Sequence, residues 1–246
     1  MATTPTRDTN GYSGLSANHV LGMVPFGKPF AWQIYEDDFH VYLPGGAGAG
    51  DWTLTETGSG TQVVADEAGG VLLLTTANGA ADRIQLQLTS ESFLFPTAKQ
   101  AAFMTRIKVG AASDSIVAVG LATEQATTNF FHDTGDLWVY DDGVLFRKDD
   151  GTTTWDFAIR KNDIETEVTN IATVTTSYIV FGFYYNGADR VTYYTGAETA
   201  AGSIYQDGGN TNWPEDAELT PTIFCEVGTT TALALSVDYI WCGVER

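Results

Sequence analysis

The chain has 246 residues, of which 43% are hydrophobic and 17% charged, and this composition excludes an intrinsically disordered protein. It carries 31 acidic and 12 basic residues, for a formal net charge of −19. Since Lys and Arg must neutralise phosphates in nucleic-acid binding, we expect no nucleic-acid partner and no anionic membrane surface as partner. The charge is explained either by solubility or by attraction to a basic partner.

Residues 1–10 are polar and do not resemble a secretory signal peptide. The sequence also lacks an apolar run long enough to span a bilayer. We therefore expect synthesis in a cytoplasm, without export.

Residues 1–35 differ from the rest of the chain, because they show no sustained hydrophobic period and are interrupted by Gly and Pro. We predict an extended, irregular N-terminal arm over 1–35 and a single β-sandwich domain over 36–246. An apolar irregular arm must dock on its own domain or on another subunit, and both alternatives stay open. Its candidate contact residues are Val20, Leu21, Met23, Val24, Phe26 and Phe30.

From Trp52 onward, apolar and polar residues alternate with the two-residue period of β-strands. The alternation is clear in 83–88, 103–109 and 233–241, so each is predicted to have one face on the core and one in water. In the last of these, the predicted core face comprises Leu233, Leu235, Val237, Tyr239 and Trp241. The runs 115–121 and 178–185 are apolar on both faces, which predicts strands covered on both sides.

Turn residues separate these strands. Asp-Gly at 142–143 and 150–151 and Asn-Gly at 186–187 predict hairpins, because Gly accepts positive φ. The stretch 137–160 is therefore predicted to be a meander of three strands. With roughly a dozen or more strands at this spacing and no helical period, we predict an all-β fold of two stacked antiparallel sheets. Cys225 and Cys242 lie in apolar runs and are expected to be buried free thiols, with a disulfide between them as the alternative.

The sequence contains no recognisable catalytic motif, and His19, His40 and His132 have no metal-ligand spacing. Asp163, Glu165 and Glu167 would share one face of a strand, and paired carboxylates are what glycoside hydrolysis requires. They resemble only loosely the E-x-D-x-E strand of the sandwich glucanases, since the order of acids differs. We predict instead the acidic outer face of an ordinary strand.

Two further features are weighed as binding sites. Several aspartates could offer oxygen ligands to calcium, but their spacing matches no EF-hand loop; they are Asp133, Asp136, Asp141 and Asp142. We predict no cofactor, with calcium as the alternative. Trp155 alternates in phase with core residues, whereas Trp213 lies in a predicted loop. Trp213 is a candidate contact residue, the alternative being a Trp folded onto its own sandwich.

The order of motifs carries a resemblance. It runs through 37–39 (DDF), 52–57 (WTLTET), 69–76 (GGVLLLTT), 82–86 (DRIQL), the two Asp-Asp-Gly turns, 178–183 (YIVFGF), 219–221 (LTP) and 233–240 (LALSVDYI). This succession resembles structural proteins of tailed bacteriophages that have a concanavalin-like (laminin-G-like) jelly roll. The likeness covers about residues 36–246.

The resemblance implies a non-enzymatic virion protein that decorates or cements the capsid surface. Its partners would be the major capsid protein and other copies of itself, as a homotrimer. The resemblance supplies no catalytic residues. A tail or fibre module that binds glycans is the alternative within the virion, and a free lectin or β-glucanase is the alternative outside it.

Overall fold

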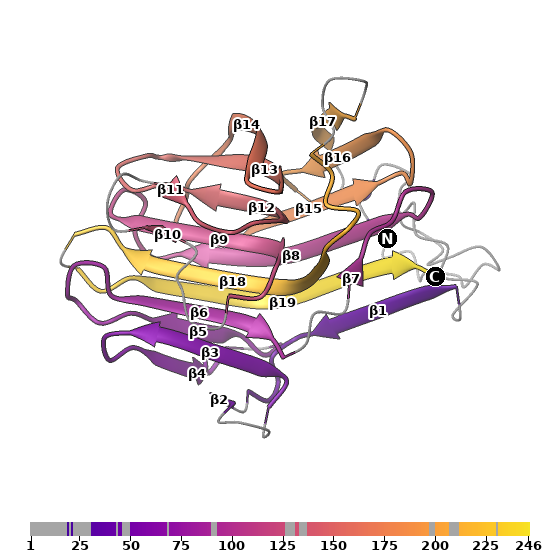
Figure 1. The fold of residues 1–246 in the computed structure, drawn as a ribbon. Coiled ribbons are helices and arrows are strands. Elements are labelled where there is room, and N and C mark those ends of the chain that lie inside the picture. Colours follow the sequence, from indigo (N-terminus) through magenta and orange to yellow (C-terminus); the bar gives the residue numbers. More distant parts are fainter. Residues whose placement is uncertain are drawn as a thin grey trace, which may run out of the picture.

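A computed structural model describes residues 19, 21, 31–42, 44–45, 50–67, 69–89, 93–125, 131–132, 137–196, 200–206, 212–229 and 231–246. Val20, Met23, Val24, Phe26 and Phe30 of the predicted arm lie outside the described residues. The described residues form an all-β sandwich of two stacked sheets and contain no α-helix (Figure 1). The predicted fold class is therefore confirmed.

The front sheet of Figure 1 has nine strands. Its order is β14 (Ile164–Thr173), β13 (Thr154–Lys161), β12 (Gly143–Lys148), β9 (Ser115–Ala122), β18 (Glu218–Val227), β6 (Arg83–Leu88), β3 (Trp52–Thr57) and β2 (Pro44–Gly45), with β7 (Phe93–Leu94) also paired to β18. All of its pairs are antiparallel except that between β2 and β3.

The rear sheet has eight strands. Its order is β17 (Ala200–Tyr205), β16 (Arg190–Tyr194), β15 (Ile179–Tyr185), β8 (Ala101–Val109), β19 (Ala234–Glu245), β5 (Leu72–Thr75) and β4 (Thr61–Val64), with β1 (Trp32–Asp37) also paired to β19. A separate two-stranded pair consists of β10 (Phe131–His132) and β11 (Leu137–Trp138). In the described residues no helix is long and apolar enough to cross a membrane.

Aromatic rings from the two inner faces fill the core between the sheets. Phe146 of the front sheet stacks on Phe181 of the rear sheet, with ring centroids 4.7 Å apart. Phe157 and Tyr193 make a second such contact at 4.9 Å. Each fully buried aromatic side chain contributes on the order of 2 kcal/mol, so these rings fix the two sheets against each other.

Several local predictions are confirmed. The run 115–121 lies in β9, where every residue is buried. The Asp-Gly at 150–151 joins the hairpin strands β12 and β13, and Gly151 has a φ of 69°. Cys225 and Cys242 are buried free thiols, one on each sheet.

Other predictions are wrong, for identifiable reasons. The alternation at 233–241 does not continue, because the register shifts between Val237 and Tyr239. Beyond that bulge Ile240 faces the core, while Trp241 packs on the outer face of the rear sheet. The 137–160 meander also fails at its first strand, because β11 pairs with β10 and not with β12.

The sandwich also begins earlier in the chain than the predicted boundary at residue 36. β1 begins at Trp32, and all six of its residues pair with β19. Trp32 to Tyr35 therefore belong to the rear sheet.

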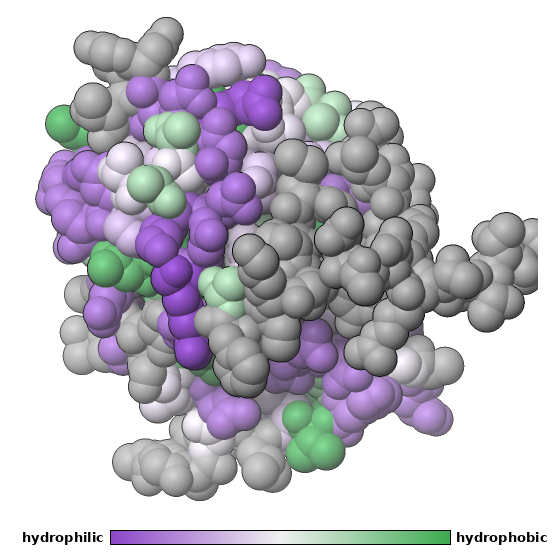
Figure 2. Space-filling model, turned by 90° about the vertical axis from the view of Figure 1, so that its right-hand side faces the viewer, coloured by the Kyte–Doolittle hydropathy of each residue, from purple (hydrophilic) through white to green (hydrophobic). Residues whose placement is uncertain are grey.

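Figure 2 views the right-hand side of Figure 1, where the chain ends, and the coloured residues there are mostly hydrophilic with scattered apolar ones.

Candidate functional site

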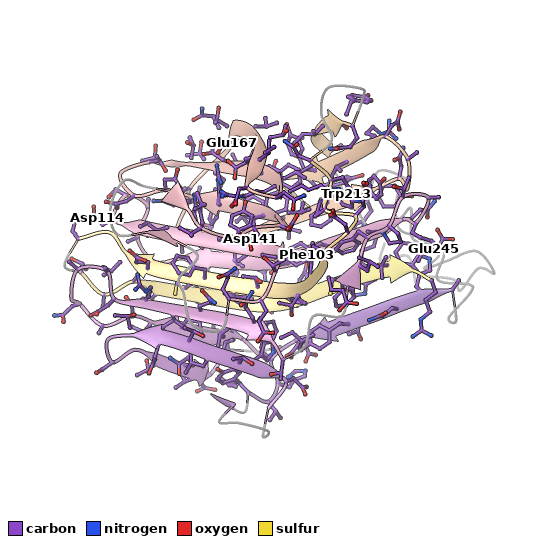
Figure 3. The ribbon with its side chains drawn as sticks, viewed as in Figure 1. Phe103, Asp114, Asp141, Glu167, Trp213 and Glu245 are labelled. Atoms are coloured by element: carbon purple, nitrogen blue, oxygen red, sulfur yellow. The ribbon has the colours of Figure 1, made fainter. Side chains whose placement is uncertain are left out.

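The acidic strand that the sequence analysis singled out lies at the edge of the front sheet. On β14, Glu165 pairs with Arg160 and Glu167 with Ala158 of β13, so both glutamates point to the outer face. Asp163 is not on the strand: it has a φ of 64° in the turn between β13 and β14. The predicted row of three carboxylates is therefore wrong, and two remain. Figure 3 labels Glu167 on this edge.

Arg147 of β12 holds these two glutamates. Its guanidinium donates two hydrogen bonds to Glu165, at 2.6 and 2.7 Å, and one to Glu167 at 2.6 Å. The Arg147 side chain is 5% exposed, and those of Glu165 and Glu167 are 22% and 28% exposed. Burial alone would lower the pKa of Arg147, but its hydrogen bonds and charge interaction with Glu165 raise the pKa above its ordinary value.

This arrangement determines what the glutamates can do chemically. In glycoside hydrolysis one carboxylate either attacks the sugar as a nucleophile or activates a water molecule. The other carboxyl donates a proton to the leaving group. Here the oxygens of both glutamates accept hydrogen bonds from one permanently charged guanidinium, in a bidentate fork at Glu165. The geometry is that of a structural ion-pair network between β12 and β14.

The segment 137–142 covers this part of the outer face. Trp138 packs edge-on against Phe224 of β18, and its indole N–H donates to Asp149 at 2.8 Å. The Tyr140 hydroxyl donates to Glu165 at 3.3 Å. Burial, and then the charge of Glu165, raise the pKa of Tyr140 above its usual range. The segment is thus held to the sheet by both apolar packing and hydrogen bonds.

A second group of polar side chains lies on β6, beyond the apolar cluster around Phe224. Gln85 and Gln87 of β6 are each only 2% exposed, although the sequence analysis placed them in water. Gln85 donates to the carbonyl of Gln125 at 2.8 Å, and the Gln87 side chain accepts from the Gln125 N–H at 2.8 Å. Gln87 also donates to the carbonyl of Thr123. The segment that follows β9 therefore covers Gln85 and Gln87 and shields both side chains from solvent.

The aspartates that were weighed as an alternative calcium site form no such cluster in the described part of the chain. Asp133 and Asp136 lie outside it. Asp142 accepts the backbone N–H of Asn162 at 3.1 Å, and burial raises the pKa of its carboxyl. No group of three or more His, Cys, Asp or Glu with metal-binding geometry occurs among the described residues.

The histidines are also separated. His40 is exposed and lies 3.1 Å from Asp38. His19 is buried and accepts the N–H of Leu21 through Nδ1. The side chain of His132 is outside the described residues.

Trp213 is buried, not exposed. It is 2% exposed and stacks on Tyr185 with ring centroids 4.0 Å apart. Its indole N–H donates to the carbonyl of Phe95 at 3.0 Å. Figure 3 shows it among the side chains of the upper part of the sandwich. Its interpretation as a contact residue is therefore wrong, and the alternative of a Trp folded onto its own sandwich holds.

Comparisons with known proteins bear on the fold. No family model and no curated protein matches the chain. A protein of unknown function from Shewanella oneidensis MR-1 matches in structure with a TM-score of 0.58 and 16% identity, over 91% of this chain and 95% of that one. The endo-1,3-β-glucanase of Streptomyces sioyaensis matches with a TM-score of 0.58 and 12% identity, over 88% and 97%.

A third match is the CBM2 module of the evolved Dit of Lactobacillus casei BL23 phage J-1, with a TM-score of 0.54 and 11% identity, over 87% of this chain and 96% of that one. Peanut lectin matches to the same TM-score. The fold is a concanavalin-like jelly roll. At these identities the likeness concerns the fold alone.

The outer face of the rear sheet of this jelly roll carries an aromatic cluster, of which the sequence analysis predicted only the covered outer face of 178–185. Its buried members are Trp32, Ala102, Met104, Tyr184, Tyr194 and Trp241. Leu21, from the predicted arm, packs against this cluster, as does Ala31. The signal was present in the sequence: Met104 and Tyr184 stand at the non-core phase of their strands, where a wet face would carry polar residues.

Proposed function

We propose that this chain is a non-enzymatic structural protein of a tailed-bacteriophage virion that binds the outer surface of the capsid shell. The observation that carries the non-enzymatic part of the proposal is the ion-pair network of Arg147 with Glu165 and Glu167. A polysaccharide hydrolase needs two carboxyls that can reach a substrate and exchange protons. Glu165 and Glu167, the paired carboxylates singled out in the sequence, instead accept hydrogen bonds from the buried Arg147, beside a face covered by 137–142.

The order of motifs along 36–246 supports the virion assignment. Its partners in this role are the major capsid protein and further copies of the chain. The net charge of −19 suits a basic patch on the shell, because complementary charge speeds association and disfavours wrong partners. Attachment of this kind is expected to weaken as salt is raised.

The first test is the copy number of the chain in purified virus particles, measured by quantitative mass spectrometry against the major shell protein. A ratio within a few-fold of the shell protein supports decoration of the capsid. A handful of copies would place the chain in the tail instead. Absence from the particle would contradict the virion assignment altogether.

The second test asks whether the N-terminal arm is the anchor. Deletion of 1–30 removes Leu21 and the other candidate contact residues of the arm but leaves β1 intact, so the sandwich should fold. We expect binding to purified capsids in a co-sedimentation assay to weaken about tenfold or more, which corresponds to the loss of a few good contacts. Tyr205→Ser on the exposed edge strand β17 is the matched control and should bind normally. Undiminished binding of the deletion variant would show that the contact surface lies on the sandwich and not on the arm.

A glycan-binding module of a phage tail is the second candidate. It is favoured by the shared fold with the CBM2 module of the phage J-1 Dit and with peanut lectin. Titration against bacterial surface polysaccharides tests it, because saturable binding would support this role. Release of reducing ends from β-1,3-glucan by the wild type, abolished in Glu165→Gln, would instead establish a hydrolase.

A further inference from the structure

Lys148, the last residue of β12, is a buried cation that takes part in neither the ion-pair network nor the aromatic cluster. Its exposed fraction is 0%, and its strand neighbour Phe146 faces the core. Burial of an ammonium group is costly unless its donors are satisfied. All of its hydrogen bonds go to backbone carbonyls: Ser115 at 2.6 Å, Asp149 at 3.0 Å and Ser113 at 3.2 Å.

These carbonyls come from two loops that meet at one end of the sandwich, marked by Asp114 in Figure 3. Ser113 lies in the loop before β9, Ser115 is the first residue of β9, and Asp149 lies in the β12–β13 turn. The N–H of Gly151 donates to Ser113 at 3.1 Å, which joins the same loops directly. A third loop reaches this end, because the N–H of Gly228 donates to the carbonyl of Asp114 at 3.4 Å.

Convergent backbone carbonyls are the ligands with which proteins replace the hydration shell of a small cation. The charges of Asp150, Asp149 and Asp114 favour a cation at this position, yet burial has the larger effect and lowers the pKa of Lys148 to about 8. Because the atoms that contact the ammonium are neutral carbonyls, the cage suits a single positive charge. Potassium and ammonium ions have that charge and fit oxygen distances of this range.

We propose that the Lys148 ammonium is the built-in cation of a carbonyl-lined site that joins the loops at this end of the sandwich. It follows that a small monovalent cation binds there once the ammonium is removed. The site is distinct from the aspartates that the sequence analysis considered for calcium. The inference does not depend on the proposed virion role.

Lys148→Ala tests the proposal, because it removes the ammonium and opens the space of its stem. The melting temperature is measured in potassium chloride, ammonium chloride and choline chloride at equal ionic strength. We expect the variant to melt below the wild type in choline chloride and to recover about 4 °C in the potassium or ammonium salt, as for any ligand that binds only the folded state. Wild type and Lys148→Met, whose side chain refills the space, should show no such difference between salts.

Equal melting temperatures of Lys148→Ala in all three salts would overturn the cation site. If Lys148→Ala does not fold, the wild type decides the question by nuclear magnetic resonance. The Lys148 ammonium should then give a slowly exchanging signal with couplings to the carbonyls of Ser113, Ser115 and Asp149. Rapid exchange of every lysine ammonium group with water would refute the proposal.

Discussion

At the scale of single residues, the guanidinium of Arg147 lies between two carboxylates that would otherwise repel each other. Glu165 and Glu167 sit two residues apart on one face of β14, and Arg147 donates three hydrogen bonds to them. Removing one partner of a buried ion pair is costly, because it leaves the other charge without compensation. The network is therefore expected to matter more for stability than surface ion pairs such as that between Lys108 and Glu67.

The corresponding variant is Arg147→Met, which preserves most of the side-chain volume. We expect its free energy of unfolding, measured by urea denaturation, to fall by about 3 kcal/mol. Adding Glu165→Gln and Glu167→Gln to the same chain should restore most of the lost stability, since these changes remove the two carboxylate charges that Arg147→Met leaves without a partner. An Arg147→Met variant as stable as the wild type would show that the ion pairs contribute nothing.

At the scale of elements, the segment 137–142 is held across the front sheet by Trp138 and Tyr140, which are 5% and 0% exposed. Trp138→Ala removes its packing on Phe224 and its hydrogen bond to Asp149. We expect a loss of about 3 kcal/mol in the free energy of unfolding, the usual cost of truncating a buried aromatic residue. Trp213→Phe, which retains most of its stacking on Tyr185, is the milder comparison. A loss below that of Trp213→Phe would mean that the segment does not depend on Trp138.

The elements also show how far the sequence could be interpreted. The alternation of 83–88 correctly predicts β6 and its core face, since a two-residue period is a local property of the chain. What covers Gln85 and Gln87 depends on the distant residues Thr123 and Gln125, which no local pattern reveals. The bulge near Asp238 has the same character, because it appears only when β19 is paired with β8.

The candidate site was predicted only in part, because local patterns do not reveal contacts between residues far apart in the chain. Glu165 and Glu167 were found as acidic residues on one face of a strand, which follows from their spacing. Their partner Arg147 is separated from them by a whole strand, so the ion pairs could not be derived from local order. Asp163 was misplaced because the turn ends one residue later than the charge pattern suggests, as its positive φ shows.

At the scale of the whole molecule, the reactivity of Cys225 and Cys242 shows whether the two sheets of the sandwich stay packed together. One lies on β18 of the front sheet and the other on β19 of the rear sheet, and both are fully buried in the shared core. Burial raises the pKa of Cys225 to about 12 and that of Cys242 well above its ordinary value. Since the thiolate is the reactive form, both groups should be inert to thiol reagents at pH 8 while the sheets stay together.

We therefore expect a chromogenic disulfide reagent to titrate no thiol rapidly in the native protein at pH 8 and two per chain in guanidinium chloride. Each folded-state pKa is raised, so the unfolded chain loses these protons first. Their contribution to stability is complete below about pH 9 and is lost as the pH rises toward 12. Cys225→Ala, which cannot ionise, should show a smaller loss over that range. Fast labelling of one thiol in the native state would reveal that one sheet opens alone, and no thiol in denaturant without reductant would reveal a disulfide.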